Sequence, residues 1–476
     1  MNQISYKDVI DKYPALNQNK LTDLWSSARS DFNVKIIVLD DDPTGIQTVH
    51  SIPVYTDWEE ETVEMAFKDE SQLVFILTNS RSFTEAKAEQ VYRLIAKRIS
   101  YASEKYNIPY LLISRSDSTL RGHYPLETDV LRQTIEEIEG NHVDGEVIIP
   151  FFEEGGRLTV HNTHFVQQAN SLVPAGETEF AKDRSFGFKS SHLGEWIEEK
   201  TKGLYKAEDV LYISLKSIRK LEIDQITEQL MTVSQFRKIV VNALNEDDIT
   251  VFTIALIKSI QRGQRFLFRT AATFTKVIGD ISSRPLLSKE ELIKDSINHN
   301  GGLVVIGSHV KKTSDQLNIL KSVSHLYFIE FDCHLVFNKK LFKKEIDRVR
   351  ILAEEKVSQG ITTVIYTKRE RIDLGNNMQE EELQLSVEIS NAVTRLVNNF
   401  TVKPKFLIAK GGITSSDIGT KGLGVKRATV AGQIAPGVPV WKTGSESKFP
   451  FIPYIIFPGN VGTENTLKDV VLNLDA

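Results

Sequence analysis

The chain has 476 residues, of which 41% are hydrophobic and 25% charged, and its formal net charge is −5. This length favours two or three domains, and this composition is typical of soluble globular proteins. The small negative charge excludes a general attraction to nucleic acids or anionic membranes, and no apolar run approaches the ~20 residues that cross a bilayer. The single cysteine excludes an internal disulfide, and the start of the chain lacks a signal-peptide pattern, so we expect a cytoplasmic protein.

The first half of the chain alternates strand-like and helix-like segments after residues 1–34, which we expect to form an N-terminal extension. Short runs rich in Val, Ile and Leu predict buried strands at 35–40, 73–80, 110–117, 145–152, 238–243 and 265–271. Amphipathic stretches such as 91–102 and 126–138 predict helices between them. This alternation predicts an α/β domain with a mostly parallel sheet over residues 35–280. Residues 154–206 are polar and weakly patterned, so we expect loops and a short helix there.

A second series begins after residues 281–300, whose polar and unpatterned sequence predicts a linker. In the domain expected at 301–476, strands are predicted at 302–310, 361–367, 405–409 and 454–457, and a long helix at 381–400. The predicted fold class is therefore α/β, with two domains that each contain a mostly parallel sheet flanked by helices.

Three strands of the second domain run into small residues before a helix begins, at Gly307-Ser308, at Gly411-Gly412 and at Gly459. Glycine lets backbone N–H groups approach a ligand, and a helix N-terminus attracts phosphate. We expect Thr313 or Ser314 to cap the helix after the first loop. No loop has the spacing of a Walker or dinucleotide motif, and ordinary tight turns are an alternative explanation.

The first domain carries an acidic cluster where its first strand ends, at Asp40, Asp41 and Asp42. Repulsion among these carboxylates costs free energy unless a metal ion, a cation or a proton-transfer role compensates for it. Arg115 and Arg121 stand near the end of another strand and suit a carboxylate or phosphate ligand. An Arg–Asp pair that ties a loop to the sheet explains the same residues equally well.

The acidic cluster also fits the opening of an aspartate phosphatase, D-x-D-x-T, at Asp40, Asp42 and Thr44. In that alternative Asp40 is the nucleophile, Asp42 is the general acid, and Thr78 supplies a hydroxyl from another strand end. This alternative leaves the glycine loops of the second domain without a role.

Six motifs, "DDDPTG", "RSDSTLRG", "FRTAATF", "GSHV", "KGGITSSDI" and "PGNVGTENTL", occur in the order seen in the four-carbon acid sugar kinases, and the chain resembles that family over about residues 35–472. The resemblance implies an ATP-dependent kinase that phosphorylates a hydroxyl of a tetronate or 3-oxo-tetronate. It also implies that the N-terminal domain holds the sugar acid, the C-terminal domain holds ATP, and the active site lies in a cleft between the domains. Pro43 and Asp40 depart from the family's "DDFTG" element.

The resemblance assigns roles to particular residues. The ATP contacts it implies are Ser308, Gly411, Gly412, Ile413, Thr414 and Gly459; the substrate contacts are Asp41, Thr44, Gly45, Arg115, Thr119 and Arg121. Asp42 or Asp117 is expected to act as the catalytic base. Mg²⁺ is expected with ATP, without assigned metal ligands. The expected partners are the sugar acid and ATP, without nucleic acid or membrane, and a homo-oligomer is left open.

Overall fold

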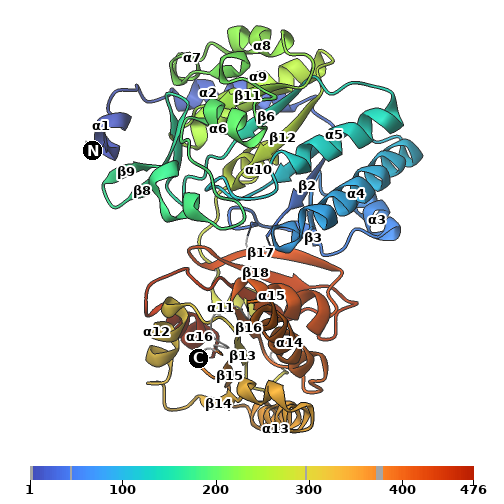
Figure 1. The fold of residues 1–476 in the computed structure, drawn as a ribbon, viewed down its shortest axis with the longest axis vertical. Helices are drawn as coiled ribbons and strands as arrows, with labels where there is room; N and C mark the ends of the chain where they lie inside the picture. Colours follow the sequence, from blue (N-terminus) through green and yellow to red (C-terminus); the bar gives the residue numbers. More distant parts are fainter. Residues whose placement is uncertain (1–3, 43–44, 295–296, 371, 373–378, 476) are drawn as a thin grey trace. The chain divides into compact units, whose positions relative to one another are not determined.

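The chain folds into two compact units (Figure 1). This computed structural model describes residues 4–42, 45–294, 297–370, 372 and 379–475. The first unit ends at Ser282 and the second begins at Ser283, but residues 49–56 belong to the second unit. The domain expected at 35–280 includes residues 49–56, and in the structure this segment pairs with a strand that lies more than 370 residues further along the chain.

The first unit is built on a parallel sheet, as predicted. In the described residues its strand order is β10-β11-β6-β12-β5-β2-β4, and each neighbouring pair is parallel. Every residue of β2 and β4 is buried, because helices cover both faces of the sheet. The strands are β2 (Lys35–Asp40), β4 (Leu73–Leu77), β5 (Tyr110–Arg115), β6 (Gly145–Ile149), β10 (Leu211–Ile213), β11 (Arg237–Val241) and β12 (Phe266–Thr270).

The helices of the first unit pack in two groups. One group contains α3, α4 and α5, and the other contains α2 and α7 to α10 around α9. Helix α4 shows why the sequence forms them: the Thr84 side chain accepts from the backbone N–H of Lys87 at its start, and Asn107 ends it in a left-handed conformation. The helices are α1 (Tyr6–Ile10), α2 (Gln18–Arg29), α3 (Glu60–Lys68), α4 (Glu85–Tyr106), α5 (Leu126–Glu139), α6 (Leu193–Lys200), α7 (Leu215–Arg219), α8 (Ile223–Met231), α9 (Glu246–Gln261) and α10 (Ala272–Ile278).

Residues 154–206 are more regular than predicted. They contribute three strands to a small antiparallel sheet of order β1-β9-β8-β7, together with α6. The prediction of loops was wrong because these strands are short and half-buried, so polar residues interrupt their apolar pattern. The strands are β1 (Ile4–Ser5), β7 (Arg157–Val160), β8 (Thr163–Gln168) and β9 (Ser171–Pro174).

The second unit has a mixed sheet of order β3-β17-β18-β19-β16-β13-β15-β14. From β19 to β14 the described strands pair in parallel, whereas β3, β17, β18 and β19 pair in antiparallel fashion. The strands are β3 (Ile52–Tyr55), β13 (Leu303–Ile306), β14 (Tyr327–Phe331), β15 (Thr363–Thr367), β16 (Leu407–Lys410), β17 (Arg427–Ala435), β18 (Val438–Thr443) and β19 (Pro453–Phe457).

Helices of the second unit also form two groups, with α12 against α16 and α14 against both α13 and α15. One core cluster joins Leu317 and Leu320 of α12 to Val304 of β13 and Ile408 of β16. The helices are α11 (Lys289–Leu292), α12 (Lys311–Leu320), α13 (Lys339–Ser358), α14 (Gln379–Asn398), α15 (Gly412–Asp417) and α16 (Thr466–Asp475). None of the helices in the described ranges is both long and apolar enough to cross a membrane.

Candidate functional site

Charged side chains gather at the carboxyl ends of the central strands of the first unit. Asp40 ends β2 and Arg115 ends β5, and the register of these neighbouring strands places the two residues side by side. Nη1 of Arg115 donates to Oδ1 of Asp40 at 3.1 Å. Their side chains are only 7% and 2% exposed, so this pair is a buried element of the sheet edge.

Arg81, which was not predicted as a site residue, binds the other two carboxylates of the acidic cluster. Its Nη2 and Nε donate to the two carboxylate oxygens of Asp41 at 2.7 and 3.2 Å, and its Nη1 donates to Asp42 at 3.1 Å. Arg81 lies in the short 3-10 turn η1 (Ser80–Ser82) that follows β4, the neighbour of β2. The sequence did contain a signal for Arg81, since it follows a predicted strand and residues that follow adjacent parallel strands meet at one sheet edge.

Asp117 and Arg121 form the third charged group of this edge. Nε of Arg121 donates to Asp117 at 2.9 Å, and the hydroxyl of Thr119 also donates to Asp117. The Arg121 guanidinium stacks over Phe180 at 5.1 Å and lies 3.8 Å from Asp183. Segment 180–183 therefore reaches this site, and the Arg121 side chain stays 26% exposed.

The local environment shifts the pKa values of Asp40 and Asp117 in opposite directions. Burial raises the pKa of Asp40 to about 7, an effect that Arg115 opposes and that the charges of Asp41 and Asp42 reinforce. Burial also raises the pKa of Asp117, but Arg81 and Arg121 outweigh it and hold that pKa below its ordinary value. Asp117 is therefore a firmly ionised group and a weak proton acceptor.

Gly45 lies in the turn after the acidic cluster, and its backbone N–H donates to the Asp42 carbonyl at 2.9 Å. A Cβ at this position would collide with the side chains of Arg115 and Asp40, so the turn can pass this close to the pair only as glycine. Thr44, which the sequence predicts as a substrate contact, lies outside the described residues.

The three glycine loops of the second unit follow adjacent strands. The order β19-β16-β13 places β16 in the middle, so the loops at Gly459, Gly411 and Ser308 lie side by side at the carboxyl edge. Thr313 Oγ1 donates to the Gly459 carbonyl at 2.9 Å and lies within hydrogen-bonding distance of Ser308 Oγ, at 3.2 Å. The prediction that Thr313 or Ser314 caps α12 was wrong, because that helix begins earlier, at Lys311, with Val310 at its N-cap.

Lys410, at the end of β16, connects all three loops and was missed from the sequence. Its carbonyl accepts the backbone N–H groups of Gly307 and Ser308, each at 3.3 Å. Its buried Nζ donates to the carbonyls of Pro458 at 2.6 Å and Gly459 at 3.3 Å. Burial, together with the charge of Lys312, lowers the pKa of Lys410 to about 7.

The central loop contains one crowded glycine, Gly411, and one open glycine, Gly412. Gly411 has a φ of +127°, and an added Cβ would lie 3.0 Å from Cβ of Ser308 and 3.1 Å from Oγ1 of Thr414. Gly412 begins α15 and has nothing within 4 Å of an added Cβ, and Ile413 is 69% exposed. The predicted ATP contacts thus form one cluster with an accessible backbone, although contact with ATP stays a prediction.

Across the described residues, no group of three or more His, Cys, Asp and Glu side chains is arranged to hold a metal ion. Magnesium that accompanies a nucleotide keeps several waters and takes only one or two carboxylates from the protein. Asp42, whose side chain is 24% exposed, is a hard oxygen donor that fits this limited requirement.

Family comparisons agree with this division of the chain. Residues 36–278 match the sugar-binding N-terminal domain, and residues 303–467 match the nucleotide-binding C-terminal domain. The fold and the two family matches together define a kinase-like protein with a sugar-binding domain and a nucleotide-binding domain. The chain belongs to the four-carbon acid sugar kinase family, which confirms the resemblance found in its motifs.

Solved structures show the same fold. A Salmonella typhimurium LT2 protein described as the "putative tRNA synthase" is 16% identical, with a TM-score of 0.66, and the match covers 92% of this chain and 98% of that one. A Haemophilus influenzae protein is 17% identical, with a TM-score of 0.62, and the match covers 92% and 100% of the two chains. Such low identities show the fold alone. No curated protein matches the chain.

Proposed function

We propose that this protein transfers the γ-phosphate of ATP to a hydroxyl of a four-carbon sugar acid, such as a tetronate or 3-oxo-tetronate. The observation that carries the proposal is the pairing of two strand-edge sites within the family's two domains. One is an arginine–aspartate cluster in the sugar-binding domain, and the other is a set of three adjacent glycine loops in the nucleotide-binding domain.

Arg121 and Arg81 are the better candidates to bind the carboxylate of the sugar acid. Their side chains are 26% and 21% exposed, against 7% for Arg115. A guanidinium binds a carboxylate through two parallel hydrogen bonds, which fixes the orientation of the acid. We assign Arg115 to a positioning role, in which it neutralises Asp40 beneath the site.

Asp42 is the proposed catalytic base. It is more exposed than Asp117, and Asp117 is held ionised by two arginines. Phosphoryl transfer needs mainly alignment and charge neutralisation, so orienting the attacking hydroxyl is as important as accepting its proton. When magnesium is bound with ATP, it neutralises phosphate charge.

Direct transfer requires the γ-phosphate and the acceptor hydroxyl to come within bonding reach. The prediction of an active site in a cleft between the two domains follows from this requirement and stays a prediction. The cytoplasmic location also stays a prediction.

A panel of C4 sugar acids, each incubated with ATP and Mg²⁺, tests the proposal through ADP release. We expect ADP release that depends on one added tetronate and on Mg²⁺. Phosphate release from a sugar-acid phosphate without nucleotide would instead support the phosphatase. That alternative requires Asp40 to reach a substrate, yet its side chain is 2% exposed and bound to Arg115.

A further inference from the structure

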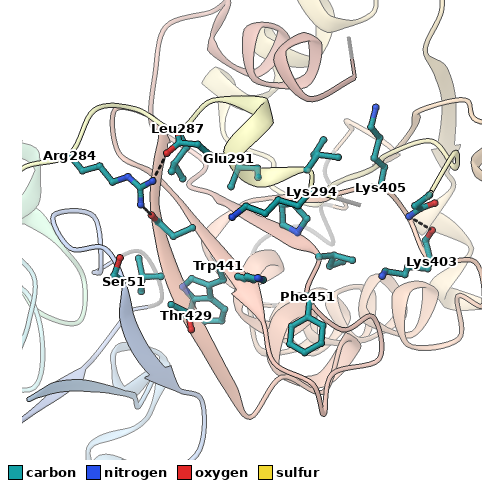
Figure 2. Close-up of a pocket in the computed structure, with 18 residues that line it drawn as sticks. Ser51, Arg284, Leu287, Glu291, Lys294, Lys403, Lys405, Thr429, Trp441 and Phe451 are labelled. Atoms are coloured by element: carbon teal, nitrogen blue, oxygen red, sulfur yellow. Dashed lines mark hydrogen bonds and ion pairs between the residues drawn. The ribbon is translucent and has the colours of Figure 1, made fainter. Parts of the chain in front are cut away.

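The second unit contains a pocket of about 570 Å³ that the proposed reaction does not use (Figure 2). Its walls come from residues between 284 and 294, from Asn298, from β17 and β18, and from the segments around the starts of β16 and β19. Lys405 lies before β16, whereas Gly411 follows it, so the pocket is at the opposite edge of the parallel strands from the glycine loops. A strand of this length spans roughly 13 Å, which separates the two sites.

The pocket lining is strongly basic. Arg284, Lys294, Lys403, Lys405 and Lys442 contribute to it, and Glu291 is the single acidic residue among the lining residues that the structure describes. Glu291 is already ion-paired with Arg284. The lining therefore carries an excess of positive charge, and an anion would find several cations around one cavity (Figure 2).

Lys405 is one of the partly buried cations of this set. Burial lowers the pKa of Lys405, the charge of Lys289 lowers it further, and Asp475 opposes both. A smaller cavity of about 370 Å³ shares Lys405, Ile293 and Asn298 with the main pocket and adds Lys289 to its lining. A bound anion would compensate for the desolvation of the Lys405 ammonium.

Two aromatic residues give the pocket an apolar side. Phe451 is 58% exposed and has a φ of +61°, a left-handed conformation that is unusual for a bulky residue. Nζ of Lys442 lies 5.7 Å from the centre of the Phe451 ring. Trp441 forms part of the wall, and its Nε1 is buried without a hydrogen-bond partner among the described residues. The folded chain thus holds an exposed ring beside a lysine.

We propose that this pocket binds a small organic polyanion, whose phosphate or carboxylate groups contact the lysines and whose ring or hydrocarbon part lies against Phe451. Its volume lies in the usual range for small-molecule sites, which is about 300–1,000 Å³. The site is separate from the glycine loops, so the proposal does not depend on the kinase reaction and gives the nucleotide-binding domain a second ligand.

Pyridoxal 5′-phosphate is a suitable probe, because it combines a phosphate, a flat ring and an aldehyde. The aldehyde condenses with a neutral lysine amine and releases water, and borohydride reduces the imine to a stable secondary amine. Peptide mapping of the full-length protein then identifies the labelled lysines. We expect labelling of Lys294, Lys405 or Lys442 to saturate with reagent concentration, whereas pyridoxal, which lacks the phosphate, labels them without saturation.

Competition identifies the anion. Protection of the pocket lysines by inorganic pyrophosphate would indicate an organic phosphate, and protection by citrate would indicate a polycarboxylate. Lys339 and Lys340, exposed at the start of α13, are the internal reference. Pocket lysines that label at the same non-saturating rate as this pair, without protection by either anion, would overturn the proposal.

A charge reversal gives a second test. Lys442→Glu changes an exposed lysine of the lining, so the fold should persist, and we expect saturable labelling at Lys294 and Lys405 to be lost. Lys340→Glu makes the same charge change outside the pocket and should preserve saturable labelling at Lys294 and Lys405. Saturable labelling of Lys294 and Lys405 that is unchanged in Lys442→Glu would show that Lys442 does not contact the anion, which would contradict the proposed arrangement.

Discussion

The aspartates at the sheet edge of the first unit have the same chemistry but different neighbours. Asp41 is held by two hydrogen bonds from Arg81, Asp117 by Arg121 and Thr119, and Asp40 by the buried Arg115. Asp42 also pairs with Arg81, but its side chain is 24% exposed, against 13% for Asp117, 2% for Asp40 and 0% for Asp41. At the residue scale, the partner of each carboxylate therefore decides whether it can accept a proton from a substrate.

Asp42→Asn tests the proposed base. We expect kcat to fall about a hundredfold or more, because the amide cannot accept the proton of the attacking hydroxyl. The nucleotide dissociation constant, measured by calorimetry, should stay unchanged. Asp31→Asn alters an exposed aspartate and should keep full activity. Normal turnover of Asp42→Asn would refute the assignment.

Asp40→Asn tests the buried pair through pH. The folded pKa of about 7 exceeds the ordinary value of 3.8, so the folded state binds more protons than the unfolded state between these pH values. Asp40 therefore stabilises the fold at low pH, and this contribution is lost as pH rises toward 7.

Urea titrations of wild type and Asp40→Asn from pH 4.5 to 8.5 measure this effect. The free energy of unfolding of the variant should rise relative to wild type as pH increases to 7, and the difference should then level off. A difference that is constant across the series would contradict the raised pKa.

At the scale of elements, three neighbouring strands bring together loops that are far apart in the sequence. Lys410 holds these loops through its carbonyl and its Nζ, while Thr313 joins the first loop to the last. The close approaches of Gly411 to Ser308 and Thr414 leave little room for side chains within the cluster. The backbone of Gly412 is then the open face that a phosphate could reach.

Gly412→Ala separates ligand access from folding. The added methyl group meets no atom within 4 Å, and alanine favours the helix that begins there, so the melting temperature should not fall. If phosphate approaches this backbone, the methyl group lies in its path, and we expect nucleotide affinity to drop about tenfold or more. Calorimetry measures the affinity, and unchanged binding would place the nucleotide elsewhere.

Lys410→Met tests the electrostatics of the same cluster. With a pKa of about 7, Lys410 is mostly neutral at pH 8, and a nearby polyphosphate should raise that pKa and cause proton uptake. Calorimetry in two buffers of different ionisation enthalpy measures this uptake. We expect it in wild type and in the exposed control Lys339→Met, and we expect its loss in Lys410→Met. Equal uptake in all three proteins would exclude the coupling.

At the scale of the whole molecule, the chain crosses between its two units more than once. Residues 49–56 leave the first unit to form β3, which pairs with β17 through Ile52–Val430 and Tyr55–Arg427. The second unit therefore depends on a strand that is encoded near the start of the sequence. Without it, β17 would become an exposed sheet edge, which favours aggregation.

Fragments of the chain test this dependence. The fragment 283–476 should be less stable and more prone to aggregate than the same fragment fused by a flexible linker to residues 49–56. Thermal unfolding and size-exclusion chromatography measure the difference, and fusion of a scrambled 49–56 segment is the control. Equal stability of the fragment with and without the native segment would show that β3 is dispensable.

Much of the fold could be predicted because buried parallel strands such as β2 and β16 are continuous apolar runs. Burial alternates along β17, but the strand was missed because Gly432 stands at a buried position without adding an apolar side chain to the pattern. Pro53 masks β3, because proline is unusual inside a strand. In the candidate site, the glycine loops and the acidic cluster were visible as local motifs. Arg81 and Lys410 were not recognised because each becomes significant only through its neighbours in space.

The sequence by itself determined the family, the two α/β domains and the types of group at each strand edge, since these follow from local patterns and ordered motifs. The tertiary structure decided which groups meet. It paired Arg115 with Asp40 and Arg81 with Asp41 and Asp42, and it placed three distant loops on adjacent strands. Strand order and burial set the pKa values and the exposure of these side chains, and both depend on contacts between residues far apart in the chain.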